Sequence, residues 1–316
     1  MCPVPFPEIE PNRSGWLDVG DGHEIYWEEC GNPAGKPVVV LHGGPGSGCS
    51  PGNRRYYDPA LWRIILFDQR NCGRSRPHAS LPTVDLSANT TWHLVSDMEA
   101  LRGFLEVEQW LLQGGSWGAS LALAYAERHP QRVSGMILLS ATSGRRSETD
   151  LLTHGLGRIL PAAWERLSSF ASRAGEGLHV IEAYARLLFD PSPKVREEAA
   201  RRWCEWETAI LPTAPAPSPR YESPEFRLAF ARLVTHYWSH GSWLEEGQLL
   251  RDAGKLAGIP GVILQGRLDL GNLSGTAWEL AAAWPGSELV FVEECGHEGG
   301  KSFSDALLEW THRLGP

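Results

Sequence analysis

The chain has 316 residues, of which 42% are hydrophobic and 21% are charged, and its formal net charge is −9. This composition excludes global disorder, and the length allows one large domain or a domain that carries an insertion. The acidic balance favours neither nucleic acid nor an anionic membrane surface as a partner.

The cysteines and the absence of long apolar runs predict a reduced, cytoplasmic protein. The six cysteines include no Cys-x-x-Cys pair, and no histidine cluster has ligand spacing, so we expect neither a metal nor another cofactor. No apolar stretch approaches the roughly 20 residues that a membrane helix needs, and the N-terminus lacks the basic and apolar regions of a signal peptide.

Apolar runs bounded by turn residues predict eight strands. Residues 38–41 and 64–67 are unbroken apolar runs, which are typical of strands buried on both faces of a sheet. Helices alternate with the later strands, so we expect a mostly parallel sheet flanked by helices. The predicted strands are residues 15–18, 23–29, 38–41, 63–67, the run that begins at 110, 133–140, 261–265 and 288–292, and the predicted core helices follow Thr91 and Ser116 or span 274–284 and 302–314.

A glycine-rich loop, residues 42–48, follows the third predicted strand. It resembles a phosphate-binding loop, but it lacks the Gly-Lys-Ser/Thr ending and misses the Gly-x-Gly-x-x-Gly spacing. A glycine loop directly after a central strand can instead offer backbone N–H groups to an oxyanion. Gly43 or Gly44 is the expected donor.

The sequence Gly114-x-Ser116-x-Gly118 lies between a predicted strand and a predicted helix. A serine on such a sharp turn holds strained dihedral angles, and larger neighbours than glycine would clash. The backbone N–H of Trp117 then points to a developing oxyanion, and the helix places its positive end beneath that charge. We therefore predict that Ser116 is a nucleophile.

Strand-like runs vanish from about residue 141 to about residue 250. Helical stretches rich in Trp, Arg and Glu replace them, which predicts an all-helical cap at 141–250 inserted into a core of 1–140 and 251–316. The fourteen tryptophans either line an aromatic substrate cavity or pack within the cap, and packing is favoured. The predicted cap helices are residues 162–170, 178–189, 194–210 and 225–238.

A serine hydroxyl is a poor nucleophile near neutral pH, so it needs a base and a carboxylate that orients the base. In open parallel sheets the chemistry gathers beyond the carboxyl ends of the strands. Asp269 and His297 each follow a late predicted strand, which gives the chain order serine, acid, histidine. Glu293 and Glu294, close to His297 in the sequence, stay open as alternative acids.

Seven segments form a distinctive set: His42-Gly43-Gly44-Pro45-Gly46, residues 68–75, Asn89-Thr90-Thr91-Trp92, residues 114–126, Trp203-Cys204-Glu205-Trp206-Glu207, Gly266-Arg267-Leu268-Asp269 and Gly296-His297. With them the chain resembles, nearly end to end, the proline iminopeptidases, the prolyl aminopeptidase branch of the α/β-hydrolases. The resemblance implies an α/β-hydrolase fold, a triad of Ser116, Asp269 and His297, and oxyanion donors at Gly44 and Trp117. It also implies a helical cap that closes over the substrate.

The same resemblance implies two cap glutamates that hold the free ammonium group of the substrate. Glu207 is one of them, and Gly43, Trp206 and Tyr237 are expected near the same substrate. The second belongs in a segment that reads Ala-Arg-Ile-Glu-Asn-His-Tyr, but here the segment reads Ala-Arg-Leu-Val-Thr-His-Tyr, so Val234 stands in place of the carboxylate. Losing one partner of a buried cation can cost several kcal/mol, so aminopeptidase activity should fall sharply.

Two functions follow from these observations, each with a small molecule or short peptide as substrate. The first is a serine hydrolase that cleaves an N-terminal residue, or a small amide or ester, through an acyl-enzyme. The second is a biosynthetic enzyme of the same fold that hydrolyses, cyclises or joins a bulky neutral small molecule. Val234 and the tryptophan count motivate the second function, whereas the resemblance favours the first. The sequence predicts no oligomeric state.

Overall fold

The computed structural model describes residues 5–214 and 217–316 of the chain. Residues 1–4, the first part of the N-terminus from which no signal peptide is expected, lie outside the described residues. Within the described ranges, no helix combines the length and the apolar character that crossing a membrane requires. The same ranges contain no group of three or more His, Cys, Asp or Glu side chains that could hold a metal ion.

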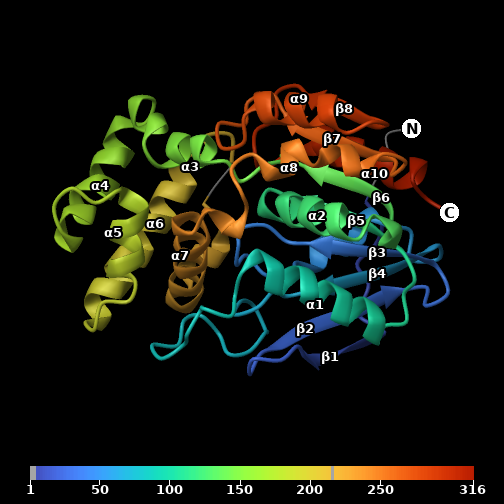
Figure 1. Ribbon diagram of the computed structural model, residues 1–316, viewed down its shortest axis with the longest axis horizontal. Helices are drawn as coiled ribbons and strands as arrows, with labels where there is room; N and C mark the ends of the chain where they lie inside the picture. The colour runs from blue at the N-terminus through green and yellow to red at the C-terminus, as the bar shows by residue number, and fades with distance from the viewer. Residues whose placement is uncertain (1–4, 215–216) are drawn as a thin grey trace.

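One sheet of eight strands runs through the core of the protein, as predicted (Figure 1). The strands are β1 (Arg13–Asp18), β2 (Glu24–Gly31), β3 (Lys36–Leu41), β4 (Trp62–Phe67), β5 (Trp110–Gly115), β6 (Val133–Leu139), β7 (Gly261–Gly266) and β8 (Ser287–Val292). Their order is β1-β2-β4-β3-β5-β6-β7-β8, with β2 antiparallel to both of its neighbours and all later pairs parallel. The loops that follow β3, β5, β7 and β8 therefore emerge at one edge of the sheet.

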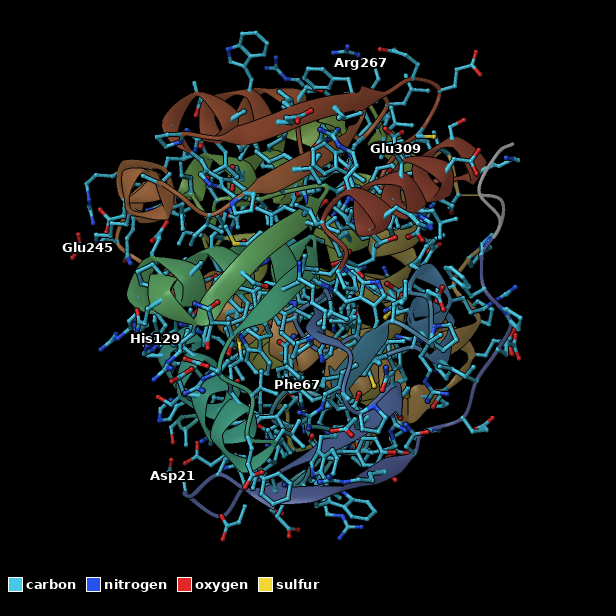
Figure 2. All side chains as sticks on the ribbon, turned by 90° about the vertical axis from the view of Figure 1, so that its right-hand side faces the viewer. Asp21, Phe67, His129, Glu245, Arg267 and Glu309 are labelled. Carbon is cyan, nitrogen blue, oxygen red and sulfur yellow. The ribbon has the colours of Figure 1, made fainter. Side chains whose placement is uncertain are left out.

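The core helices are α1 (Thr91–Phe104), α2 (Trp117–Arg128), α8 (Gln248–Arg251), α9 (Ser274–Ala283) and α10 (Lys301–Arg313). Alternate residues of the apolar runs in β3 and β4 face opposite sides of the sheet. Val39 and Ile65 belong to an apolar cluster with α1, α2 and α9, whereas Val38 and Ile64 belong to a second cluster with α10. Phe67 accordingly lies in the interior, and Figure 2 shows it well inside the charged residues labelled at the periphery.

The described residues between β6 and β7 form helices and no strand. Five of these helices, within residues 146–214 and 217–239, make a helical layer beyond the edge of the sheet at the left of Figure 1, and they share an apolar cluster of their own. Trp203 and Trp206 are buried in that cluster, whereas Trp238 faces a cavity. The helices are α3 (Arg146–Thr153), α4 (Pro161–Ala171), α5 (Val180–Leu187), α6 (Pro193–Ala209) and α7 (Pro224–Ser239).

Candidate active site

Ser116 lies at the sharp turn between β5 and α2. Its backbone has φ 53° and ψ −121°, a conformation that is strained for a residue with a side chain. Close approach explains the two glycines of the motif, because a Cβ at Gly114 would overlap the carbonyl oxygen of Gly118, and a Cβ at Gly118 would overlap that of Leu41. The turn thus presents Ser116 at the carboxyl edge of the sheet.

The glycine loop after β3 lies against this turn. A Cβ at Gly43 would lie 3.1 Å from the carbonyl oxygen of Gly115 and 3.5 Å from the Cβ of Ser116, so a side chain there would crowd both segments. Gly44 has φ +113°, which residues with side chains rarely adopt. The N–H of Trp117 is the first of α2, where helix N–H groups have no partner within the helix. The N–H groups of Gly44 and Trp117 therefore belong to the two segments that meet at Ser116.

Asp269 and His297 form a hydrogen-bonded pair. Nδ1 of His297 lies 2.9 Å from Oδ2 of Asp269, whose side chain is fully buried. The other carboxylate oxygen accepts hydrogen bonds from the backbone N–H groups of Gly271 and Asn272, both at 2.9 Å. Because the carboxylate is held in this way, it fixes the orientation of the imidazole and leaves Nε2 for chemistry.

The two alternative acids from the sequence analysis, Glu293 and Glu294, have other surroundings. Glu293 pairs with Arg267, with Oε1 3.0 Å from Nη2, and Glu294 is exposed. Ser116 and His297 line the same cavity, but the Ser116 hydroxyl has no hydrogen-bond partner in the described parts of the chain. Hydrogen bonds between catalytic groups are often long before substrate binds and tighten afterwards.

Burial and charge act in opposite directions on the acid–histidine pair. Burial disfavours the imidazolium ion, but the nearby carboxylate outweighs this effect and raises the pKa of His297 above its ordinary value. Burial also disfavours the carboxylate of Asp269, but His297 and the backbone donors hold the pKa of Asp269 below its ordinary value. The pair therefore combines an ionised carboxylate with an imidazole that is ready to accept a proton.

A cavity of about 380 Å³ opens between the helical layer and the carboxyl edge of the sheet. Its lining includes Gly43, Gly44, Ser116, Glu207 and His297 from the set of residues expected at the site. A cavity of this size accommodates a small molecule or the first residue of a peptide.

Glu207 extends from α6 into this cavity. One of its carboxylate oxygens accepts a hydrogen bond from Nε1 of Trp203 at 3.0 Å. Burial raises the pKa of Glu207 to about 7, although the Trp203 bond and the charge of His297 oppose the shift. A cation bound beside Glu207 would favour its ionised form.

Three residues expected near the substrate lie behind the cavity wall. Val234 is 0% exposed and belongs to the apolar cluster of the helical layer. Trp206 donates its Nε1 to a backbone carbonyl of α3 at 3.0 Å. Tyr237 donates its hydroxyl to Asn89 at 2.7 Å and packs against Trp117, with ring centroids 4.7 Å apart. All three support the wall from behind.

The wall also contains residues that the sequence analysis did not identify. Phe226, Phe230 and Trp238 of α7 line the cavity, and their spacing of four and eight residues places them on one helix face. From that spacing the sequence could have predicted an aromatic face on this helix. Arg220 and Glu298 also line the cavity, but no sequence pattern around either residue predicts this position.

The chain is similar in sequence to known proteins. The family model described as the alpha/beta hydrolase fold matches residues 36–300. A protein named "Probable proline iminopeptidase" from Streptomyces coelicolor is 53% identical over 313 residues, which cover 98% of this chain and 97% of the relative. The "Proline iminopeptidase" of Xylella fastidiosa strain Temecula1 is 44% identical over 296 residues, 92% of this chain and 93% of the relative.

Solved structures share the fold. The alpha/beta hydrolase MGS-M2 from a deep-sea metagenome library has a TM-score of 0.61 at 18% identity and covers 94% of this chain and 97% of its own. The proline iminopeptidase of Mycobacterium smegmatis has a TM-score of 0.59 at 19% identity, with coverage of 96% and 98%. At such identities the likeness supports the fold alone.

Proposed function

The chain belongs to the proline iminopeptidase family of α/β hydrolases, and from this premise we propose that it releases an N-terminal residue, proline above all, from short peptides or small amides. The observation that carries the proposal is that Ser116, Glu207 and His297 line one cavity, with Asp269 bonded to His297. The serine, the histidine and the aspartate supply a nucleophile and its base. Glu207 supplies an anion for the free amino terminus.

In the proposed reaction Nε2 of His297 takes the proton of the Ser116 hydroxyl while the serine oxygen attacks the substrate carbonyl. The N–H groups of Gly44 and Trp117 stabilise the oxyanion that forms. The imidazolium then protonates the leaving amine, the C–N bond breaks, and the acyl group stays on Ser116. Water then loses a proton to His297 and attacks this ester, and the imidazolium returns that proton to the Ser116 oxygen as the acyl–oxygen bond breaks, while Asp269 holds the imidazole in place.

We assign the role of cap to residues 141–250. Glu207 projects from this part of the chain into the cavity, so closure of the cap would bring the carboxylate to the amino terminus of the substrate. Val234 provides no second carboxylate, and a single anion holds an ammonium less firmly than two. We therefore expect a weaker preference for free amino termini than two glutamates would give.

A second candidate is a biosynthetic enzyme that acts on a bulky neutral molecule. The aromatic face of Phe226, Phe230 and Trp238 favours this candidate, because it suits a large uncharged substrate. The same nucleophile and base would serve it.

We further propose a cytoplasmic protein with a small soluble substrate as its partner. The support is that the described cysteines, Cys30, Cys49, Cys72, Cys204 and Cys295, are all buried free thiols. Thiols persist in reducing compartments, whereas secreted proteins commonly form disulfides.

Turnover of L-prolyl-7-amido-4-methylcoumarin tests the proposed function. The parent protein should hydrolyse it, and Ser116→Ala should lower kcat by at least about 10³-fold. Labelling of Ser116 by a fluorophosphonate, without turnover of any aminoacyl substrate, would overturn the peptidase and favour the second candidate.

The variant Val234→Glu tests the account of the amine site. Val234 lies behind the cavity wall, so the longer glutamate side chain has to extend through that wall; its carboxylate should then raise kcat/KM for the prolyl substrate by about tenfold or more, because it adds a second anion for the ammonium group. Val234→Gln has nearly the same size without the charge and should give no such gain. Equal effects of the two substitutions would show that the missing charge is not the cause.

A further inference from the structure

The turn that follows β4, residues 68–75, takes no part in the chemistry proposed above. Residues 68–72 of this turn are nevertheless buried: Asp68 is 1% exposed, and Gln69 and Arg70 are each 2% exposed. Polar loops normally lie at the surface, and buried polar side chains need hydrogen-bond partners. The partners of this turn therefore indicate what it holds in place.

The side chain of Gln69 bridges the two segments that meet at the nucleophile. Its Nε2 donates to the carbonyl oxygen of His42, directly before Gly43, at 2.9 Å. Its Oε1 accepts from the indole Nε1 of Trp117, directly after Ser116, also at 2.9 Å. One buried amide thus links the glycine loop to the start of α2.

His42 extends this link to the peptide unit of the first oxyanion donor. The backbone N–H of Gln69 donates to Nε2 of His42 at 3.0 Å, which leaves the ring proton on Nδ1. Nδ1 then donates to the carbonyl oxygen of Gly43 at 3.0 Å, and burial lowers the pKa of His42, which favours this neutral ring. The carbonyl of Gly43 and the N–H of Gly44 belong to one planar peptide, so fixing the carbonyl also fixes the direction of that N–H.

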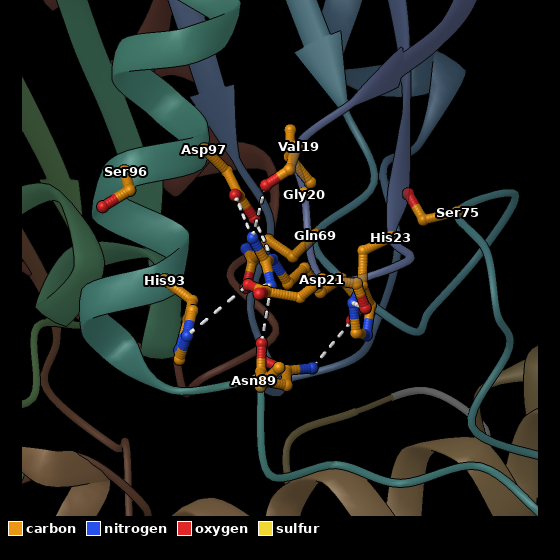
Figure 3. Close-up of polar contacts among 12 residues, drawn as sticks. Val19, Gly20, Asp21, His23, Gln69, Ser75, Asn89, His93, Ser96 and Asp97 are labelled. Atoms are coloured by element: carbon orange, nitrogen blue, oxygen red, sulfur yellow. Dashed lines mark hydrogen bonds and ion pairs between the residues drawn. The ribbon is translucent and has the colours of Figure 1, made fainter.

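The turn is itself anchored to the core. Arg70 donates from Nε and Nη2 to the two carboxylate oxygens of Asp97 in α1, at 2.7 and 2.8 Å. Figure 3 shows Gln69 beside this cluster, into which the carbonyl of Val19 also points. Asp68 accepts from the N–H of Cys49 at 2.6 Å, beyond the other end of the glycine loop. The turn that carries Gln69 is therefore itself held in place by side-chain bonds to its neighbours.

We propose that Gln69 is a positioning residue that sets the N–H groups of Gly44 and Trp117 relative to each other. Donors that are already aimed need no reorganisation when negative charge develops, so they stabilise the transition state more than the bound substrate. The proposal rests on the proposed function only in requiring that an oxyanion forms at Ser116.

Four variants separate positioning from stability. Gln69→Leu removes both side-chain hydrogen bonds at similar volume, and Gln69→Glu replaces the donor that faces the His42 carbonyl with an oxygen. Trp117→Phe removes only the indole donor. Gln109→Leu makes the same chemical change at an exposed glutamine, which donates to a backbone carbonyl at 2.8 Å, and should match the parent.

We expect Gln69→Leu to lower kcat by about 10- to 100-fold while KM stays within about threefold of the parent value. Inhibition by L-proline boronic acid, which forms a tetrahedral adduct on a serine, should weaken by a similar factor. Inhibition by the product L-proline should not change. In the double variant Gln69→Leu/Trp117→Phe the losses should be less than multiplicative, because both substitutions break one bridge.

Parent-like kcat in Gln69→Leu would overturn the proposal, as would equal weakening of both inhibitors. If that variant does not fold, Gln69→Glu and Trp117→Phe allow the same comparison, and parent-like kcat in both would overturn the proposal equally. The parent's turnover of the prolyl substrate is measured first, so a failure of the proposed function is seen separately. In that event the variants are compared on p-nitrophenyl acetate, which requires only the nucleophile, its base and the oxyanion donors.

Discussion

Glu207 and His297 both have pKa values above their ordinary ones, for different physical reasons. Burial raises the pKa of Glu207 to about 7. At His297 burial lowers the pKa, but the Asp269 carboxylate outweighs this effect and raises the pKa above its ordinary value. Loss of the Glu207 proton creates the anion for the ammonium group, and loss of the His297 proton creates the base. The loss of either proton should favour the reaction as pH rises.

The first prediction concerns substrate binding. KM for the prolyl substrate should fall by up to about tenfold between about pH 6 and about pH 8, because the ionised fraction of Glu207 grows across this range. In Glu207→Gln, which has the same size but no charge, KM should be higher and nearly independent of pH. Steady-state kinetics of the two proteins across this range provide the measurement. An unchanged pH dependence of KM in the variant would contradict the role of Glu207.

Glu127 is a second carboxyl group with a raised pKa, and it lies at the end of α2, away from the candidate active site. Both of its carboxyl oxygens are buried and have no hydrogen-bond partner within the described residues. Burial, together with the charge of Asp252, raises its pKa to about 8, against the opposing charges of Lys255 and Arg251. The folded protein therefore holds this proton more tightly than the unfolded chain does.

The second prediction follows from the direction of this pKa shift. Between the unfolded pKa of about 4.5 and the folded pKa of about 8, the free energy of unfolding should fall as pH rises, because the unfolded chain has released this proton while the folded protein still holds it. Glu127→Gln should remove this loss and be more stable than the parent by roughly 1–3 kcal/mol at pH 8, with little difference near pH 5.

Urea unfolding at the two pH values measures this difference. Glu108→Gln changes the same charge at an exposed position and should shift the free energy of unfolding by less than about 0.5 kcal/mol at either pH. If Glu127→Gln has the same free energy of unfolding as the parent at both pH values, the buried, unpaired carboxyl is not the cause of the pH dependence.

At the scale of elements, the contact between β3 and α2 depends on the absence of a side chain at Gly118. A Cβ there would overlap the carbonyl oxygen of Leu41. We predict that Gly118→Ala costs roughly 2–3 kcal/mol or more, because backbone would have to move. Gly103 of α1 has open space around its Cβ position, so Gly103→Ala should stabilise the protein by about 0.5–1 kcal/mol.

Chemical unfolding of both alanine variants tests the third prediction. The two substitutions are chemically identical, and both sites lie in helices. Losses of similar size at both positions would mean that helix propensity, and not the approach of β3, decides the result.

Most elements could be predicted from the sequence because each has a local cause. Thr90 accepts from the N–H of His93 at the start of α1, as expected of a capping residue, and α2 ends at Arg128 because Pro130 disfavours helical geometry before it. The predicted strands match the observed ones to within a few residues at their ends. The short helix α3 could not be predicted, since only two of its eight residues, Leu151 and Leu152, are apolar.

The partners of side chains could not be predicted in the same way. Asn71 has φ 64°, a conformation that favours glycine, but its side chain accepts from Asn89 at 2.9 Å and donates to the carbonyl of Pro77 at 2.8 Å. Glycine at that position could not make the two side-chain bonds. The bonds of Gln69 were equally unpredictable, because they join residues far apart in the chain.

At the scale of the whole molecule, the cavity lies where the helical layer meets the sheet, and the two parts are held together on several sides. Arg232 of α7 donates to the carbonyl oxygens of Ala79 and Leu81 at 2.8 and 2.9 Å. Tyr237 reaches Asn89 in the segment before α1, and Arg220 bonds the carbonyl of Ser47 in the glycine loop. A site at such a junction depends on residues from both parts, which explains why its wall was less predictable than its nucleophile.

The most direct test asks which residue becomes covalently modified. After reaction with a fluorophosphonate, mass spectrometry of the digested protein should find one adduct, on Ser116, and prolyl hydrolysis should be lost in the same proportion. His297→Ala should slow this labelling by at least about 100-fold, because the serine loses its base. An adduct on another residue, together with full hydrolysis by Ser116→Ala, would contradict the account.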